Sequence, residues 1–585
     1  MHEETALRYR CFLLLVSMPL AAVFMTACDG EGLKWIEGQL LAAGDLTPTS
    51  PGAGTTPGTT PPTGPRPDPD PDSPSFTGTW IASYGDDVAS GSTDRGKNEY
   101  AVRIELSQNR STNLISGTGT MMRAFREITA AEENAFDHVP LDIEGTVSDS
   151  VATLSVISTT QGSVQPLPNG TLDFEQFWEL RHAGDKLVGI YSAFDAADLL
   201  ARSGHFYWYR VDTGDLDATW VTGFSDRFIA DDLFDAGFDR RGCTARLMDV
   251  NRDFVGTLSG SGRFGWFTPH DNRQLELTGA TLNSDVLAFT FDLDGVLDVI
   301  DWLGFHTDGI MAAVYGQFDD AELMTHNGYA TWFTSPIQVQ LQDFNGTWVT
   351  CFADTVASGH RMDYLVIASV MVLSGGSVTG TAKVLIVDDS DTMPGFETYT
   401  ILDGAAKGAI LGSRLQMKLR NPAGATFEWD LELGDSVLAG SYQRLDAGEN
   451  VLGHGSAVWR AASSPSVFGD WAASYFDTFA TGEADDPSED SQLAEITISS
   501  VDPSGDVAGH GTLSIVADSF SPRGITLSGS VGSDDVIIWE WGGDLNGPTH
   551  WRLRQAGDFL YGVYKNLDTA DQLEFRGHAL FVRAD

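Results

Sequence analysis

Short apolar runs that alternate with polar residues dominate the chain from Phe76 to its end, separated by Gly, Asn, Asp or Ser. Alternation with a period of two indicates half-buried β-strands, because successive side chains point to opposite faces of a sheet. We find no sustained helical periodicity in this region. In its first part the pattern predicts about eight strands, near Trp80–Tyr84, Tyr100–Ser107, Ile115–Arg123, Leu141–Val147, Ala152–Ser158, Phe174–Arg181, Leu187–Phe194 and His205–Val211.

A Trp and a Tyr recur thirteen residues apart in four places, with a turn-forming dipeptide midway between them. A two-residue hairpin loop there would place each Trp directly opposite its Tyr on one face of the sheet. Side chains of this size are expected in the interior, where they either fill a core or line a ligand cavity. The pairs are Trp178 and Tyr191, Trp302 and Tyr315, Trp429 and Tyr442, and Trp551 and Tyr564.

The hairpin belongs to a unit that occurs four times, each time opened by another Trp: Trp80, Trp220, Trp348 and Trp471. A repeat this long is a domain rather than a solenoid repeat or a propeller blade. Closely spaced strands joined by consecutive hairpins favour an antiparallel, up-and-down order. The predicted fold class is all-β, with four tandem barrels of roughly eight strands after a disordered Pro/Thr-rich linker. The predicted units are residues 76–213, 214–337, 338–463 and 464–585.

Three units close on a strand that carries an Arg, at Arg210, Arg460 and Arg583, whereas the second unit has Thr334. A Gly-x-Trp on the first strand and an Arg on the last resemble the lipocalin and avidin group, the calycins. The resemblance implies eight-stranded barrels in which this Arg packs on the opening Trp and closes one end. It does not imply biotin binding, because Ala82, Thr222, Thr350 and Ala473 stand where the avidins have an Asn.

After each hairpin Tyr an Asp follows four residues later, and a second acidic residue comes three positions after that. Asp446 with Glu449 is one example. The spacing is typical of a capping box on a single helical turn. A calcium site is the alternative, although one carboxylate pair supplies few of the six to eight oxygens that calcium requires.

The N-terminus carries export signals. Arg8 and Arg10 precede an apolar run from Cys11 to Met25 that is short for a membrane span and suits a signal peptide. Small residues then precede Cys28, which resembles the lipobox of bacterial lipoproteins. We therefore expect a signal peptide over 1–27 and lipidation at Cys28; ordinary secretion is the alternative. A Pro/Thr/Gly-rich linker over 28–75 would hold the folded part away from the membrane.

Charge restricts the partners. The formal net charge is −47, from 82 acidic and 35 basic residues, which argues against nucleic acid because phosphates demand a basic face. The expected partners are a membrane, contacted through the lipid anchor, and an unknown small ligand, glycan or envelope protein. We expect the bacterial cell envelope, with the outer membrane or cell surface favoured over the inner membrane.

Catalytic signatures are missing from the sequence: we find no His-Glu-x-x-His, no Gly-x-Ser-x-Gly and no phosphate-binding loop. We therefore predict no enzyme activity, no cofactor and no metal site. Cys243 and Cys351 lie in adjacent units and could form a disulfide in an exported protein; two separate buried thiols are the alternative.

Three functions remain open on this reading. An envelope-anchored lipoprotein could present its barrels for binding or display. A structural spacer would need only filled barrels. An enzyme with an unrecognised site is the third possibility, and it requires a convergent polar cluster.

Overall fold

The computed structural model describes residues 75–584 with internal gaps, of which the longest are 90–97, 125–135, 160–171, 230–241 and 481–490. The described chain is almost entirely β-structure, as predicted. It forms four antiparallel barrels in which strands that are consecutive in sequence are hydrogen-bonded neighbours.

Each barrel closes when its first main strand pairs with its last. In barrels 1 and 2 the closing pairs are β1 with β9 and β10 with β18. A further two-residue strand, β2 or β11, pairs with the closing strand. Barrels 3 and 4 are closed rings of eight strands. Tandem up-and-down barrels are therefore confirmed.

The strand bounds are as follows. Barrel 1 contains β1 (Gly78–Gly85), β2 (Val88–Ala89), β3 (Glu99–Asn109), β4 (Leu114–Ala124), β5 (Phe136–Ser148), β6 (Val151–Ser158), β7 (Gln176–Ala183), β8 (Lys186–Phe194) and β9 (Leu200–Arg210). Barrel 2 contains β10 (Thr219–Ser225), β11 (Phe228–Ile229), β12 (Gly242–Arg252), β13 (Thr257–Phe267), β14 (His270–Leu282), β15 (Val286–Leu293), β16 (Val299–Thr307), β17 (Ile310–Phe318) and β18 (Met324–Ser335).

After a short 3₁₀ turn, η2 (Leu341–Phe344), barrel 3 contains β19 (Gly346–Ala353), β20 (Asp363–Val372), β21 (Val378–Val387), β22 (Glu397–Ala409), β23 (Gly412–Arg420), β24 (Thr426–Leu433), β25 (Val437–Leu445) and β26 (Val451–Ala461). Barrel 4 contains β27 (Gly469–Ala480), β28 (Ser491–Val501), β29 (Asp506–Ile515), β30 (Arg523–Val531), β31 (Val536–Gly542), β32 (Thr549–Ala556), β33 (Phe559–Leu567) and β34 (Leu573–Arg583).

The predicted capping boxes are wrong where the structure describes them. Asp446 does accept hydrogen bonds from the backbone N–H groups of Gly448 and Asn450, at 2.7 and 2.9 Å. The segment is nevertheless a tight hairpin connection between β25 and β26, and Glu449 has a φ of 65° rather than a helical value. An Asp side chain can close such a turn by itself. Asp319 and Glu322, like Asp198 and Asp571, lie outside the described residues.

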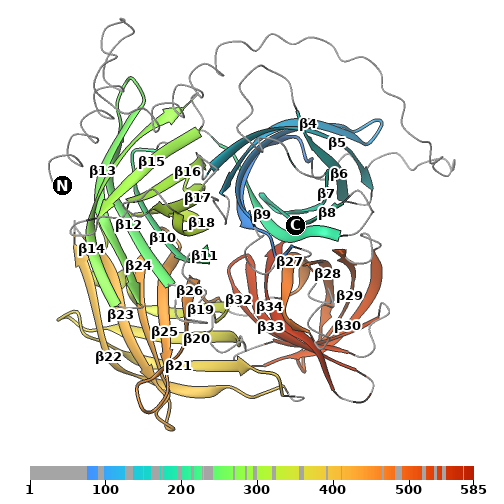
Figure 1. The fold of residues 1–585 in the computed structure, drawn as a ribbon. Coiled ribbons are helices and arrows are strands. Elements are labelled where there is room, and N and C mark those ends of the chain that lie inside the picture. The colour runs from blue at the N-terminus through green and yellow to red at the C-terminus, as the bar shows by residue number, and fades with distance from the viewer. Residues whose placement is uncertain are drawn as a thin grey trace, which may run out of the picture.

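The four barrels form a closed ring (Figure 1). The outer face of the first strands of one barrel packs on the outer face of the sixth to eighth strands of the next, and we call each such contact a seam. Barrel 4 contacts barrel 1 in the same way. Four apolar clusters fill the seams; examples are Ile81 with Phe305 between barrels 1 and 2, Val221 with Val437 between 2 and 3, Leu365 with Val563 between 3 and 4, and Leu493 with Ile190 between 4 and 1.

Candidate functional site

The four hairpins have the predicted register. Each Trp is the direct cross-strand partner of its Tyr, in Trp178 with Tyr191, Trp302 with Tyr315, Trp429 with Tyr442, and Trp551 with Tyr564. All eight side chains are at most 2% exposed and belong to the four barrel cores. Equal offsets around a two-residue loop keep both partners on the inner face.

A buried aspartate recurs beside the hairpin Tyr in every barrel, and we name this end of the barrel the aspartate end. The hydroxyl of Tyr442 donates to Asp354 at 2.9 Å, and the other three hairpin tyrosines donate to Asp86, Asp226 and Asp477. The four carboxylates are at most 2% exposed. Each aspartate stands six residues after the opening Trp, in the sequence Trp-x5-Asp, which our sequence reading missed. The even spacing is the available signal, because it puts the Asp on the same inner face of the strand as the Trp.

Barrels 1 and 3 surround this aspartate with more donors. Asp86 accepts hydrogen bonds from Tyr100 at 3.1 Å and from the backbone N–H of Asn98 at 2.7 Å, and it forms an ion pair with Arg202. Asp354 accepts from Tyr364 at 2.5 Å and from Arg444 at 3.2 Å. Arg202 lies on β9 whereas Arg444 lies on β25, so the two barrels supply this arginine from different strands.

Burial controls the protonation of these groups. It raises the pKa of Asp354, although Arg444 and the two tyrosine hydroxyls oppose that rise. Burial first, and the neighbouring aspartate second, raise the pKa of Tyr364 and Tyr442 well above the ordinary value. The tyrosines therefore stay protonated as donors. The arrangement ties the end of the first strand to the strands that follow, and its carboxylate and tyrosine side chains are buried.

The opposite end of each barrel, the tryptophan end, is plugged by the residue four positions before the opening Trp. In all four barrels the indole Nε1 donates to that residue's carbonyl oxygen, at 2.9–3.1 Å. The plugging residues Phe76, Leu216, Phe344 and Val467 are at most 2% exposed. The opening tryptophans Trp80, Trp220, Trp348 and Trp471 are core residues, at most 6% exposed.

The predicted closing arginines lie over the Trp in two barrels. Arg210 lies over the Trp80 ring at 5.7 Å, and Arg583 lies over the Trp471 ring at 4.4 Å. In each case the arginine is the direct cross-strand partner of that Trp. Thr334 takes the position opposite Trp220.

Arg460 does not close barrel 3, and its assignment is wrong. Its cross-strand partner is Val349, one residue past Trp348, so its side chain points out of the barrel. The guanidinium lies 4.0 Å from the ring centroid of Phe559 in barrel 4. Lys186 of barrel 1 approaches the same ring at 5.6 Å. Arg460 and Phe559 therefore stand where three barrels meet.

The barrel interiors are filled at the level of the tyrosines. In barrel 3 the rings of Tyr364 on β20 and Phe427 on β24 are 5.5 Å apart, although these strands lie on opposite sides of the eight-stranded ring. Rings three strands apart meet in the other barrels, for example Tyr475 and Trp551 at 5.5 Å. An eight-stranded barrel is just wide enough for side chains to fill it, and these do.

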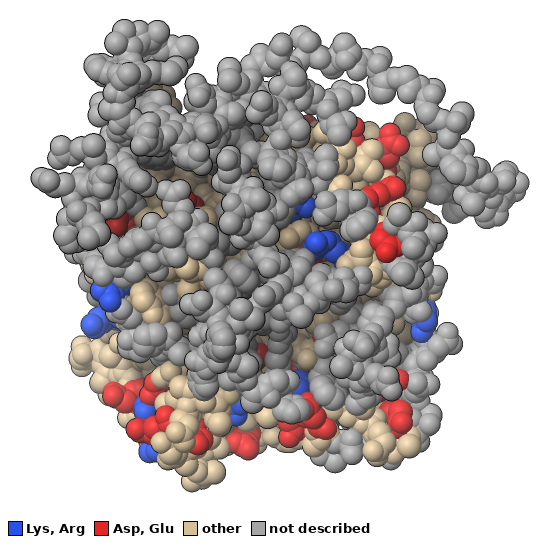
Figure 2. Space-filling model, in the orientation of Figure 1, with Lys and Arg blue, Asp and Glu red and all other residues tan. Residues whose placement is uncertain are grey.

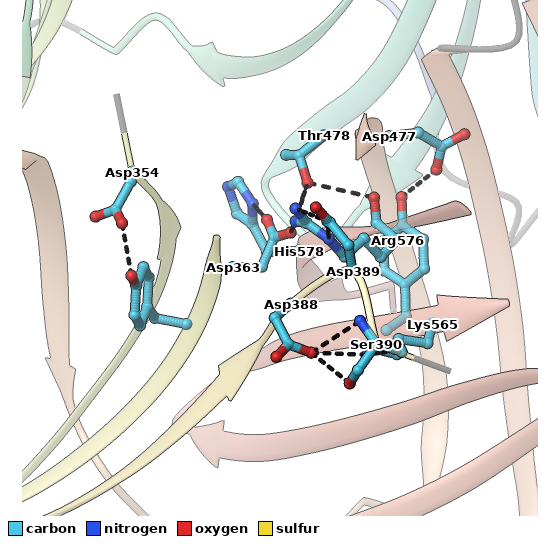
Figure 3. Close-up of polar contacts among 12 residues, drawn as sticks. Asp354, Asp363, Asp388, Asp389, Ser390, Asp477, Thr478, Lys565, Arg576 and His578 are labelled. Carbon is cyan, nitrogen blue, oxygen red and sulfur yellow. Dashed lines mark hydrogen bonds and ion pairs between the residues drawn. The ribbon is translucent and has the colours of Figure 1, made fainter. Parts of the chain in front are cut away.

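A second polar site lies in the seam between barrels 3 and 4 (Figure 3). Asp363 of β20 forms an ion pair with Arg576 and a 2.9 Å hydrogen bond with His578 Nδ1, both on β34 of barrel 4. Arg576 also binds Asp389 at 2.7 Å. Lys565 of barrel 4 lies 3.3 Å from Asp388 of barrel 3. The side chains of Asp363, Arg576 and Lys565 are at most 1% exposed, so this cluster joins two barrels through compensated buried charges.

The predicted disulfide is wrong. Cys243 points into barrel 2 and packs in its core, whereas Cys351 packs in the seam between barrels 3 and 4. The Cys351 thiol donates to the carbonyl oxygen of Ala579 at 3.3 Å. Cys351 does point outward, as its odd spacing from Trp348 predicts, but Cys243 faces the interior of another barrel.

Cys28, the signal peptide and the linker lie outside the described residues. Within the described ranges, no helix is long and apolar enough to cross a membrane. Among the same residues, no group of three or more His, Cys, Asp or Glu side chains is placed to hold a metal ion.

No protein-family model matches the chain, and no curated protein does. Among solved structures, it is similar to a protein of unknown function of the DUF3598 family from Nostoc punctiforme PCC 73102, with 12% identity and a TM-score of 0.15 over 44% of this chain and 96% of that one. It is also similar to kievitone hydratase from Nectria haematococca, with 12% identity and a TM-score of 0.17 over 46% of this chain and 91% of that one. The fold itself defines the class, a tandem protein of eight-stranded antiparallel barrels.

Proposed function

We propose that this chain is a noncatalytic display scaffold of the bacterial cell envelope, anchored through a lipid on Cys28. Four filled barrels would act as a rigid ring that presents the segments at the aspartate ends to a glycan or an envelope protein. The contact of Tyr364 with Phe427 across barrel 3 carries the proposal, because a ring pair that spans the interior occupies the place of a small ligand.

The lengths of the connections favour the aspartate ends as the presenting surface. In barrel 1 the connections that leave this end include residues 125–135 and 159–175. At the tryptophan end, β5 to β6 and β7 to β8 are joined by two residues each, 149–150 and 184–185. Binding residues are often carried on loops that a rigid scaffold positions.

The negative charge of the protein limits which partners the scaffold could bind. Described acidic side chains gather along the lower edge of the molecule, over barrels 3 and 4 (Figure 2). Together with the net charge of −47, they disfavour anionic surfaces as partners. A neutral glycan or a protein with a basic face fits better.

A spacer is the second candidate, since filled barrels would serve it equally well. Replacing residues 159–175 with a Gly/Ser linker distinguishes the two functions. With both proteins prepared as unanchored Cys28→Ser variants, the display function predicts an unchanged melting temperature and loss of retention on purified envelope fractions. Unchanged retention would favour the spacer.

Two further measurements test the proposal. Cys28→Ser should abolish incorporation of a fatty-acid probe and release the protein from membranes, whereas Cys11→Ser should change neither. Titration of the purified protein with 1-anilinonaphthalene-8-sulfonate should give no saturable enhancement of fluorescence. Stoichiometric, saturable binding of the dye that quenches the fluorescence of the buried tryptophans would show an interior cavity and overturn the filled-barrel function.

A further inference from the structure

Two of the four seams carry a buried ion pair at the same structural position, but with opposite polarity. Two facing residues define this position. One is the fifth residue of the second main strand of a barrel, and the other is the third residue after the hairpin Trp of the next barrel. Between barrels 2 and 3, Arg246 faces Glu432, with Nη1 and Oε2 3.5 Å apart. Between barrels 4 and 1, Glu495 pairs with Arg181.

These charges are buried or partly buried, so their signs matter. The side chains of Arg246 and Arg181 are 3% exposed, Glu432 is 0% exposed and Glu495 is 31% exposed. Further contacts support each pair. Arg263 of barrel 2 also pairs with Glu432, and Glu179 lies 3.8 Å from Arg181 while accepting a 2.8 Å hydrogen bond from Ser514 of barrel 4.

The opposite polarity makes the wrong pairings repulsive. If barrel 2 packed on barrel 1 through this face, Arg246 would meet Arg181. If barrel 4 packed on barrel 3, Glu495 would meet Glu432. Like charges brought together in a desolvated interface exclude a partner more strongly than a matched pair adds affinity. The other two seams have one charged and one apolar residue at this position, Arg103 with Phe305 and Ile367 with Arg554.

We propose that these two ion pairs of opposite polarity select the partner of each barrel face, and so direct barrel 2 to barrel 3 and barrel 4 to barrel 1. The seam between barrels 4 and 1 depends on this selection most, because no linker joins these two barrels. In that seam an apolar cluster provides the affinity, through Leu493, Ala472, Val188 and Ile190. The charges provide the specificity for the correct partner.

The test uses the full-length protein and the seam between barrels 4 and 1. Arg181→Glu and Glu495→Arg, made singly, should each open the ring. Small-angle scattering should then show a larger radius of gyration. The rate of amide exchange in β8 and β28 should rise on the order of tenfold or more, because each ~1.4 kcal/mol of lost protection raises the rate tenfold. The double variant R181E/E495R should return both readouts to wild-type values. Glu144→Arg, an exposed charge reversal on β5, should change neither.

Glu495→Gln separates selection from affinity, because it removes the attraction without adding a like charge. A ring that stays closed in this variant supports selection by repulsion. A ring that opens as far as in Glu495→Arg would show that the pair supplies affinity, and would overturn the proposal. Single reversals that leave the ring closed, or a double variant that stays open or fails to fold, would also overturn it.

Discussion

The buried aspartates define the chemistry of this molecule at the scale of single residues. Asp86, Asp226 and Asp354 directly follow a first strand, and Asp477 lies within β27. Each accepts a hydrogen bond from a tyrosine hydroxyl at a site that is at most 2% exposed. A carboxylate in such a place is costly unless donors surround it, and hydrogen bonds to charged groups are the strong ones. We therefore assign these aspartates a structural role, in which their hydrogen bonds hold neighbouring strands together, rather than a role as catalytic acids or bases.

Trp551 should be the most sensitive single position of barrel 4. Its ring contacts Tyr475, Tyr564 and Phe581, with centroids 4.5–5.5 Å apart, and the side chain is 2% exposed. Trp551→Ala should lower the free energy of unfolding by ~3–5 kcal/mol, as truncation of core aromatic residues does. Urea unfolding followed by far-UV circular dichroism measures this. Phe468→Ala, at a side chain that is 59% exposed, is the control and should cost little.

Asp363 should make the stability of the seam between barrels 3 and 4 depend on pH. Burial alone would raise its pKa, but the hydrogen bond from His578 and the charges of His578 and Arg576 hold the pKa below the ordinary value. A carboxyl whose pKa is lower in the folded state contributes stability above its unfolded pKa, about 3.9. That stability is lost as the pH falls through the folded pKa.

Asp363→Asn should therefore destabilise the protein at neutral pH by ~3–5 kcal/mol, because Arg576 loses a buried partner. The difference from wild type should begin to narrow below about pH 4, the unfolded pKa, and should continue to narrow until the pH passes the lower folded pKa, where the wild-type carboxylate is protonated too. Urea midpoints at pH 7 and pH 3 measure this, with Asp142→Asn on the exposed face of β5 as the control. A difference that is constant with pH would contradict the role of the charge.

At the scale of elements, the register of all four hairpins was predicted correctly, whereas the register of the closing strand was predicted correctly in barrels 1 and 4 and wrongly in barrel 3. The two-residue loop and the equal spacing of Trp and Tyr leave only one register, and that register is observed. The closing strand depends on a pairing between residues far apart in the chain. Arg210 and Arg583 stand two residues after a core aromatic, Trp208 and Phe581, whereas Arg460 directly follows Trp459. That odd spacing was the available sign that Arg460 points outward.

Arg460→Ala should therefore weaken a seam rather than a barrel. It removes a guanidinium 4.0 Å from the Phe559 ring, a contact worth about 1–2 kcal/mol when partly buried. Amide exchange should rise in β33 of the neighbouring barrel. Arg583→Ala is the matched comparison, because its contact with Trp471 lies within barrel 4, so exchange should rise in β27 instead. If amide exchange instead rose around Trp348 in Arg460→Ala, Arg460 would have the predicted role of closing barrel 3.

At the scale of the whole molecule, the ring was not foreseen. Separate barrels strung on linkers would satisfy the strand pattern equally well. The available signal was an apolar residue directly after each opening Trp, where an isolated barrel would face water: Ile81, Val221, Val349 and Ala472. All four are fully buried in seams. Which barrel packs on which depends on outer surfaces that several strands form together, and the periodicity of single strands does not predict such surfaces.

A head-to-tail contact forms a ring only when the last unit meets the first; otherwise it leaves two complementary ends open. Deletion of barrel 4, residues 464–585, would leave such ends. Barrel 3 would expose Val349, Leu365 and Leu385, and barrel 1 would expose Val188 and Ile190. Contiguous apolar patches of this kind promote association.

The truncated protein should therefore self-associate as its concentration rises, with barrel 3 of one copy packing on barrel 1 of another and the chain of contacts left unclosed. Sedimentation velocity over a hundredfold range of concentration measures this. Deletion of residues 1–74 is the control, because it leaves every seam intact and should give a monomer throughout. A truncated protein that stays monomeric, with the melting temperature of the full chain, would show that the barrels fold independently and that the ring is incidental to their stability.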